Sequence, residues 1–206
     1  MGIQTEIHAS AYAGAFTDPV FQSQAVFRAL MDAMARPGTI TPLGAAAAPP
    51  EPLGPGAGAI ALTLCDDGTP VWLSPALAKS SVAAWLSFHT GSARTDVKPE
   101  ARFVFVEAGG IVPGFDQFAL GSQEYPDRSA TLVLEIAALE GGAGLIATGP
   151  GINNEAVISP MGLPDIFLTL WAENRALFPR GVDLILVAGT DVLCLPRTTK
   201  LRHREV

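Results

Sequence analysis

The sequence is short of charge and has no apolar run long enough to span a membrane. Only 16% of its 206 residues are charged, against 49% hydrophobic residues, and the mean hydropathy is +0.33. No apolar stretch approaches the ~20 residues of a membrane-spanning helix, and residues 1–15 lack the cationic start and continuous apolar core of a signal peptide. We therefore expect a cytoplasmic protein without a membrane segment, folded as one domain over residues 1–206. Its high hydrophobicity also indicates that part of its exterior is buried against other chains.

Basic residues and cysteines are also scarce. Thirteen Lys and Arg residues stand against twenty Asp and Glu residues, and the resulting net charge of −7 argues against a nucleic-acid partner, because nothing offsets repulsion from phosphate. The local exception is a basic tail over residues 201–206. The two cysteines, Cys65 and Cys194, have no C-x-x-C spacing and lie in apolar segments. They are interpreted as small buried hydrophobes.

Recognisable catalytic and metal-binding motifs are missing. His8, His89 and His203 are far apart in the sequence and none has a metal-ligand spacing, so no metal site is expected. There is no G-x-S-x-G elbow, and Lys79 and Lys98 lie in polar surroundings that would not make a Schiff-base nucleophile. The sequence therefore predicts neither a catalytic residue nor a bound cofactor.

The most informative stretch that is present lies near the C-terminus. The nearly unbroken apolar run from Val182 to Ala188 predicts a central strand that is covered on both faces. Gly189-Thr190-Asp191 has turn chemistry and precedes a second apolar run, Val192–Leu195, so the two runs predict a hairpin. Pro196 ends the ladder pairing. The residues that follow it form either a solvated exit segment or a contact with an anion or a partner. They are Arg197, Thr198, Thr199 and Lys200.

The first helix is predicted between two prolines. Asp18-Pro19 supplies an N-cap and a proline at the first helical position, and Pro37-Gly38 stops the helix. The expected apolar stripe consists of Phe27, Leu30, Met31 and Met34. Residues up to Phe16 are expected to form a poorly anchored, flexible arm.

The rest of the chain alternates between strand and helix patterns. Residues 41–58 are rich in Pro, Ala and Gly and are expected to form a surface loop. Further strands are expected within 71–73, 102–107, 131–136, 145–148 and 155–158, and further helices within 59–65, 74–88 and 164–175. Together these patterns predict an α/β fold with a mixed central sheet flanked by helices.

Two more residues are candidates for a binding site. Arg128 ends a glycine-rich interval, residues 109–128, that shows no periodicity, and long irregular intervals are often functional or interfacial. His89 follows a helical stripe and precedes Thr90-Gly91. A histidine at a helix C-terminus can simply complement the helix dipole, and that interpretation stands beside the functional one.

The order and spacing of several short motifs resemble the H subunit of the bacterial carbon-phosphorus lyase, or phosphonate-utilisation, system. Each motif is weak alone, but together they cover most of the chain. They are Phe27-Arg28-x-Leu30, Ala33-Met34-x-x-Pro37-Gly38, Leu62-Thr63-Leu64 to Asp67, Thr69–Ser74, Phe88-His89-Thr90, Gly149–Ile152, Phe178–Leu186 and Pro196–Thr199.

The resemblance implies a fold similar to the large domain of pyridoxal-phosphate (PLP)-dependent transferases, without PLP. It also implies a core complex with the G, I and J subunits and a homodimer when the chain is isolated. That system joins an alkylphosphonate to the ribose of ATP, releases adenine and forms a ribose 1-phosphonate 5-triphosphate. The H subunit is an accessory or structural subunit of it, with no established catalytic residue to carry over.

Two alternative functions remain. The chain could be a stand-alone enzyme that binds a phosphonate or nucleotide phosphate, and it would then use Arg197, Thr198 and Thr199 with Arg128 or His89. It could also be a PLP enzyme, which would absorb light through its Schiff base. High apolarity without a catalytic set favours the obligate subunit over both.

Overall fold

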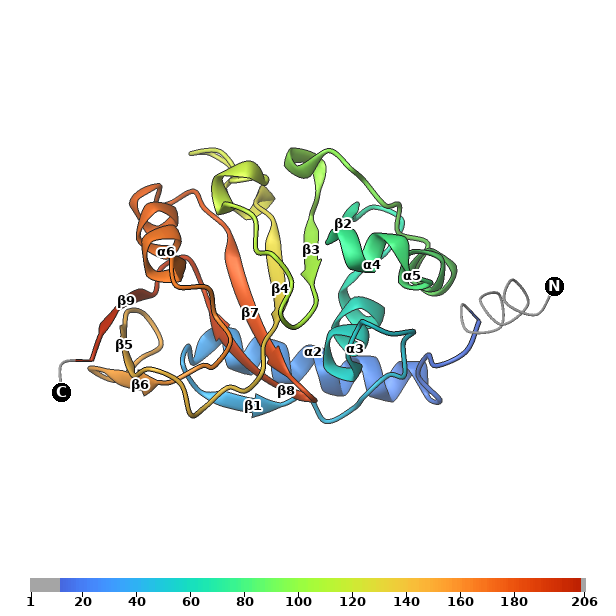
Figure 1. Cartoon of the computed structure of the whole chain (residues 1–206), viewed down its shortest axis with the longest axis horizontal. Coiled ribbons are helices and arrows are strands. Elements are labelled where there is room, and N and C mark those ends of the chain that lie inside the picture. Colours follow the sequence, from blue (N-terminus) through green and yellow to red (C-terminus); the bar gives the residue numbers. More distant parts are fainter. Residues whose placement is uncertain (1–11, 205–206) are drawn as a thin grey trace.

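A mixed six-stranded sheet forms the centre of the fold, which the computed structural model describes over residues 12–204. From one edge to the other, its strands are β1 (Ile40–Pro42), β8 (Asp191–Leu195), β7 (Asp183–Ala188), β4 (Thr131–Glu135), β3 (Phe103–Val106) and β2 (Val71–Leu73). The four strands from β7 to β2 run parallel, whereas β8 pairs antiparallel with β7 and β1 antiparallel with β8 (Figure 1). The expected α/β class with a mixed sheet is confirmed.

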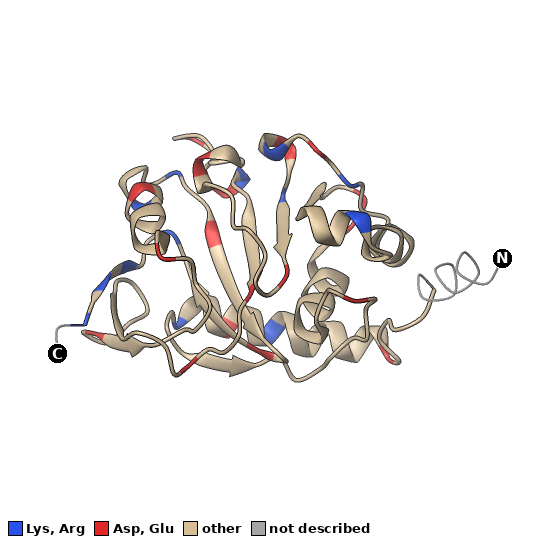
Figure 2. Cartoon of the chain, in the orientation of Figure 1, with Lys and Arg blue, Asp and Glu red and all other residues tan. Residues whose placement is uncertain are grey.

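Helices cover both faces of this sheet, and each face has its own hydrophobic cluster. One face packs against α2 (Pro19–Ala35), α3 (Pro55–Leu64), α4 (Pro75–Lys79) and α5 (Val82–Thr90). The other face packs against α6 (Phe167–Ala176) and the 3-10 helix η2 (Phe115–Gln117). Two further 3-10 helices, η1 (Lys98–Glu100) and η3 (Pro126–Arg128), precede β3 and β4. Because both faces are covered, the parallel strands carry apolar residues at nearly every position, and Figure 2 shows them without charge along most of their length. The exceptions are Thr131, Glu135 and Asp183, which lie at the strand ends.

Strand β7 is the central strand that its apolar run predicts. It lies between β4 and β8, and its successive side chains enter the two clusters alternately. Leu184 and Leu186 belong to the cluster beside α6, and Ile185 and Val187 belong to the cluster beside α2 and α3. The hairpin to β8 is also confirmed, with Gly189 in a left-handed conformation at the turn (φ +59°).

Helix α2 begins and ends where predicted, but it buries a different face. The Asp18 carboxylate accepts a hydrogen bond from the backbone N–H of Phe21, and Pro19 is the first helical residue. The buried residues are Val26, Leu30 and Ala33. The expected stripe is therefore wrong in part, because Phe27 and Met31 are 49% and 57% exposed. Apolar residues occur on two sides of this helix, and their spacing alone does not show which side meets the sheet.

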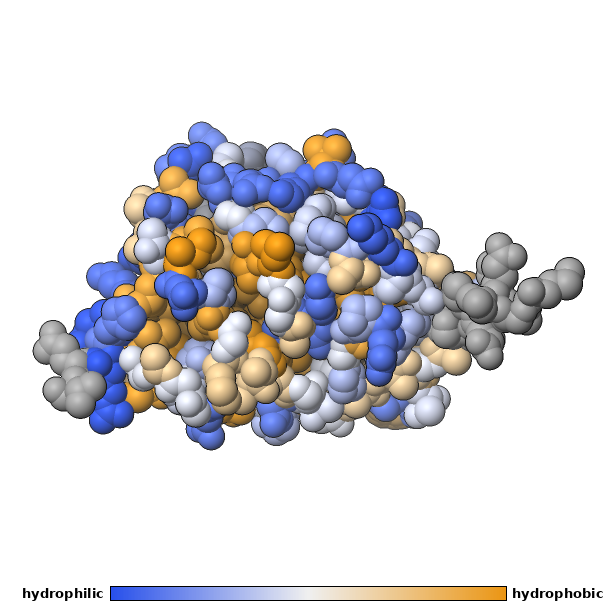
Figure 3. All heavy atoms as spheres, viewed as in Figure 1, coloured by the Kyte–Doolittle hydropathy of each residue, from blue (hydrophilic) through white to orange (hydrophobic). Residues whose placement is uncertain are grey.

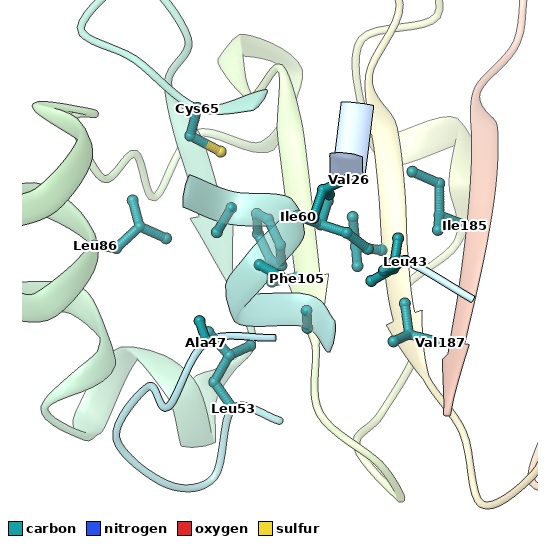
Figure 4. Packing of buried hydrophobic residues seen from close by; sticks show 14 of the residues in the cluster. Val26, Leu43, Ala47, Leu53, Ile60, Cys65, Leu86, Phe105, Ile185 and Val187 are labelled. Carbon is teal, nitrogen blue, oxygen red and sulfur yellow. The ribbon is translucent and has the colours of Figure 1, made fainter. Parts of the chain in front are cut away.

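The expected surface loop over residues 41–58 is also wrong in part. Its ends belong to β1 and α3, and between them Leu43, Ala47 and Leu53 are buried. Figure 4 shows these three side chains in the same cluster as Phe105 and Val187 of the sheet. The prolines interrupt regular structure, yet the apolar residues between them anchor the segment to the core.

Both ends of the described chain are held more firmly than expected. Residues 1–11 of the predicted arm lie outside the described residues, but in residues 12–16 the Ala13 carbonyl accepts a hydrogen bond from Trp85 Nε1 (2.7 Å) and Phe16 is buried. The basic tail begins as strand β9 (Lys200–His203), which pairs with β5 (Leu145–Thr148). Strand β6 (Ala156–Ile158) completes this small antiparallel sheet.

Two expectations from composition can be compared with the structure. Cys65 and Cys194 are buried and unpaired, as expected, and burial raises the pKa of both thiols. None of the helices formed by residues 12–204 combines the length and apolarity needed to cross a membrane.

Candidate functional site

The candidate residue Arg197 follows β8, and its guanidinium forms hydrogen bonds within the protein. Its Nε donates to Asp183 Oδ1 (3.1 Å), its Nη2 to Asp183 Oδ2, and its Nη1 to the carbonyl of Pro126. The two side chains of this ion pair are only 13% and 22% exposed. Such a bidentate pair ties the exit of β8 to the start of β7 and to η3. Arg197 therefore acts as a structural clamp, and its donors are not free for an anion.

Thr198 and Thr199 continue this turn toward the small sheet. Thr198 is half-buried and Thr199 is fully buried. The Thr199 carbonyl accepts a hydrogen bond from Trp171 Nε1 of α6 (2.9 Å), and its backbone N–H donates to Pro196 O (2.8 Å). Its Oγ1 is buried without a hydrogen-bond partner among the described residues. The backbone of this threonine, not its hydroxyl, holds α6 against β9.

Arg128 lies in the same neighbourhood but remains open to solvent. Its guanidinium stacks on the ring of Tyr125 (4.1 Å to the ring centre), and its carbonyl accepts a hydrogen bond from Arg102 Nη1. Arg102 and Arg128 line a surface hollow of about 390 Å³ beside Glu100. The structure thus brings Arg128 and Arg197 together around η3, at the amino ends of the parallel strands, and leaves Arg128 as the accessible cation of the pair.

His89 is not part of this cluster. It lies in α5, which packs on the other face of the sheet, and its ring contacts the rings of Trp85 and Phe88 edge-on (5.2 and 4.9 Å between ring centres). Burial lowers the pKa of His89, and the nearby backbone of Ala13 partly offsets this effect. His89 does lie in the last turn of α5, where the helix-dipole interpretation places it, and its ring also packs against Trp85 and Phe88.

A second cluster, which the sequence reading did not identify, lies at the carboxyl ends of the parallel strands. Ser74 directly follows β2, Glu107 directly follows β3, and Glu135 is the last residue of β4. The Ser74 hydroxyl donates to Glu107 Oε2, and the backbone N–H of Gly54 donates to both oxygens of Glu135 (2.9 and 3.1 Å). A polar residue at the end of each of three buried strands was the available signal, because open α/β sheets bind ligands at this edge.

The environment of Glu135 favours its protonated form. Burial raises the pKa of this carboxyl to about 7; the hydrogen bond from Gly54 lowers the pKa, and the charge of Glu107 raises it. A carboxyl with such a pKa can accept or donate a proton near neutral pH. Within the described residues, however, no three acidic, cysteine or histidine side chains meet in a group that could hold a metal.

The edge that carries this cluster is occupied by the chain itself. The segment 43–56 crosses the ends of β4 and β7, where Leu43 N–H donates to Thr190 O (3.0 Å) and Gly56 N–H donates to Gly189 O (2.9 Å). Gly54 completes these contacts through Glu135. A hollow of about 530 Å³ remains on the segment between Ala47 and Pro55. Glu135 thus anchors this segment, whereas Glu107 is engaged by Ser74.

Comparisons with known proteins agree over nearly the whole chain. Residues 14–202 match the family model described as bacterial phosphonate metabolism protein (PhnH). A relative from Rhizobium meliloti (strain 1021), the alpha-D-ribose 1-methylphosphonate 5-triphosphate synthase subunit PhnH, is 68% identical over 192 residues, which cover 93% of this chain and 96% of the relative. The putative C-P lyase subunit protein HtxG of Stutzerimonas stutzeri is 33% identical over 180 residues, or 87% and 86% of the two chains.

Proposed function

Because the chain belongs to the PhnH family of bacterial phosphonate metabolism proteins, we propose that it is a subunit of an alpha-D-ribose 1-methylphosphonate 5-triphosphate synthase. The observation that carries this function is the 68% identity to such a subunit, which extends over nearly the full length of both chains. The synthase would join an alkylphosphonate to the ribose of ATP and release adenine. Its substrate ATP is consistent with a cytoplasmic location.

Within the synthase, we propose an accessory role for this chain. Arg197 and Thr199 are committed to internal contacts, and the segment 43–56 covers the edge of the sheet where α/β proteins usually bind ligands. The exterior, in contrast, exposes large apolar side chains on several elements. They include Val20, Phe21, Phe27, Met31, Phe88, Ile111, Val157, Met161, Ile166 and Phe178. A surface of this kind suits an obligate subunit.

The proposed partners are the G, I and J subunits of the carbon-phosphorus lyase complex, with a homodimer when the chain is alone. Apolar residues surround α6 on the face shown in Figure 3. Close by, Met161, Leu163 and Phe167 line an apolar hollow of about 330 Å³. This face offers contact area for a larger subunit.

Co-purification tests the accessory role. The chain, expressed with its G, I and J subunits, is expected to elute with them and to be required for full synthase activity. Arg128→Glu is a suitable probe of the η3 surface, because Arg128 is exposed, whereas reversal of Arg197 would break the ion pair with Asp183. A stable monomer that does not bind any of the other three subunits would contradict the proposal.

A weaker second candidate is a binding protein for a phosphonate or a nucleotide phosphate. The hollow between Arg102 and Arg128 favours it, because two guanidinium groups can receive an anion there. Titration calorimetry with ATP and with methylphosphonate on the isolated chain decides the question. Heat that disappears in Arg128→Ala would support this candidate, and absence of heat for both ligands would remove it.

The likeness to the large domain of PLP-dependent transferases is also part of the proposal. Helices on both faces of a mixed sheet are consistent with it. A PLP lysine must lose water to become nucleophilic, but Lys79 and Lys200 are exposed and Lys98 donates to Gln117 above the ring of Trp72. We therefore expect no Schiff-base absorbance when the protein is mixed with excess PLP.

A further inference from the structure

Strand β9 is an edge strand with hydrogen-bonding groups on its outer side. In the small sheet it pairs with β5, and the backbone N–H of Arg204, directly after β9, donates to Gly144 O (3.0 Å). Bonded and non-bonded pairs alternate along an antiparallel ladder, so the N–H and C=O groups of Leu201 and His203 point away from β5. Within residues 12–204, no strand and no other backbone group binds them. The outer edge thus offers two donors and two acceptors.

The fold covers this edge only as far as Thr199. The carbonyl of Thr199, directly before β9, accepts a hydrogen bond from Trp171 Nε1 of α6 (2.9 Å). Thr199 is fully buried, whereas Leu201 is half-buried and His203 is exposed. Figure 1 shows β9 running from α6 to the left border of the molecule. Open strand edges pair readily with another chain, and beyond Thr199 this edge is accessible to one.

One face of β9 is basic. Lys200, Arg202 and Arg204 alternate along the strand and are all exposed. Arg202 forms an ion pair with Glu155 (2.9 Å), whereas Lys200 and Arg204 have no such partner in the described part of the chain. Figure 2 shows these cations along β9, at one end of a molecule whose net charge is −7. This face therefore favours acidic side chains.

The opposite face of β9 is apolar. Leu201 packs against the cluster beside α6, and His203 lines the hollow of about 330 Å³ together with Leu145 and Phe167. Met161, which is 44% exposed, borders the same hollow. Successive side chains of a strand point to opposite faces. A strand added beside β9 would thus place every second side chain on the apolar face and the others beside the cations.

These features together select an extended polypeptide as the partner. A nucleotide phosphate could meet the cations, but it could not bind the C=O groups of Leu201 and His203, because these groups require a donor. A second copy of β9 would bring Lys200 and Arg204 close to like charges. A strand with alternating acidic and apolar residues satisfies the edge and both faces.

We propose that β9 is a docking edge for an extended segment of another subunit, in which acidic and apolar residues alternate. The segment adds a strand to the small sheet, and its backbone binds the outward N–H and C=O groups of Leu201 and His203. This inference rests on the proposed function, because it takes the partner from the G, I and J subunits. It adds the surface and the chemistry of the contact.

The first test measures amide hydrogen exchange by NMR on the full chain. The probe is a blocked six-residue peptide of alternating Glu and Val, and the control peptide has Lys in place of Glu. At saturation with the acidic peptide, exchange at the Leu201 and His203 amides should slow at least about tenfold, and the basic peptide should have no effect. Unchanged exchange, or equal slowing by both peptides, would overturn the inference. So would ATP shifting the resonances of β9 where the acidic peptide does not.

The second test removes one outward donor. The N–H of His203 is not used by β5, so His203→Pro should leave the sheet intact and raise the dissociation constant of the acidic peptide about tenfold. His203→Ala keeps the N–H and should stay within about threefold of the wild type. Circular dichroism and thermal unfolding check that both variants are folded. A folded His203→Pro that binds like the wild type would contradict the proposed pairing.

A charge reversal tests the basic face without proline. Lys200→Glu should raise the dissociation constant of the acidic peptide about fivefold, because it replaces an attraction with a repulsion. Lys79→Glu is the matched control, since Lys79 is also exposed but lies in α4, and it should change little. Equal effects of the two reversals would show that the peptide senses only the net charge, and the inference would fail.

Co-purification with the G, I and J subunits separates this inference from the proposed function. Both stand if the wild type and His203→Ala elute with these subunits and His203→Pro does not. If His203→Pro elutes with them as well as the wild type does, the inference fails and the proposed function stands. If the wild type binds none of the three but binds the acidic peptide through β9, the docking edge stands and the proposed function fails.

Discussion

Glu135→Gln should stabilise the protein at neutral and alkaline pH. The raised pKa of Glu135, about 7 against an ordinary value of 4.5, means that the folded state holds a proton that the unfolded state has already released between these two values. The stability of the wild type therefore falls as the pH rises from about 4.5 to about 7, and above that window the cost stays constant. Glutamine carries no charge and can still accept the hydrogen bond from Gly54.

The magnitude follows from the pKa difference. At about 1.4 kcal/mol per pH unit, the rise to about 7 gives a ceiling of about 3 kcal/mol. Because the carboxyl is half-buried and in part screened by water, we expect a gain of about 1–2 kcal/mol at pH 8. The charge of Glu107 contributes to the rise, so Glu107→Gln should lower the pKa of Glu135 and reduce the gain.

Urea unfolding at several pH values between 5.5 and 8 provides the assay. The quantity to compare is the free energy of unfolding of Glu135→Gln minus that of the wild type, because this difference cancels every other titrating group. It should increase with pH up to about 7 and then level off. Glu140→Gln, which also removes one carboxylate but from an exposed position nearby in the chain, is the control for the loss of a single negative charge. A flat difference for Glu135→Gln, or a variant less stable than the wild type at pH 8, would refute the assignment of a buried, proton-binding carboxyl.

Two further predictions concern stability. Arg197→Met should lower the free energy of unfolding in urea by roughly 3 kcal/mol, because it leaves the largely buried Asp183 carboxylate without its partner. The control Arg128→Met should lower it by less than about 1 kcal/mol. Similar losses for the two variants would mean that the Arg197–Asp183 pair does not stabilise the fold. Gly151→Ala should lower stability by at least about 2 kcal/mol, since φ is +82° and the new Cβ would collide with the last turn of α2. Gly109→Ala is its control, because φ is +75° there but nothing lies within 4 Å, and it should cost only about 1 kcal/mol.

Local sequence patterns predicted those parts of the fold that local chemistry determines. The run of apolar residues in β7 has no polar face and therefore predicted a central strand, and the turn chemistry of Gly189-Thr190-Asp191 predicted a hairpin. The Asp18-Pro19 start of α2 depends on capping chemistry within one turn of helix. The two short strands at the edges, β1 and β9, were not predicted, because each forms only by pairing with a strand distant in the sequence.

The candidate site was predicted less well than the fold, because its members meet only through the order of the strands. Arg128 and Arg197 do come together at η3, but no local pattern showed that Asp183 would engage Arg197. His89 was grouped with them although α5 packs on the other face of the sheet. Tertiary contacts decide which charged residues are paired, and the spacing of residues along the sequence does not predict these contacts.

The carboxyl edge of the sheet is covered by the protein's own segment 43–56. In open α/β sheets this edge usually receives the ligand, but here the Leu43 and Gly56 N–H groups bind the carbonyls of the β7–β8 turn, and Gly54 binds Glu135. Even an added methyl group at Gly54 would collide with the Glu135 carboxylate, so the segment fits this edge closely. Backbone N–H groups thus bind Glu135 and the turn carbonyls, and the Ser74 hydroxyl binds Glu107. Large apolar side chains, in contrast, remain exposed on the exterior. The exposed apolar side chains are therefore the surfaces through which this chain can bind other proteins, as a subunit of a larger assembly must.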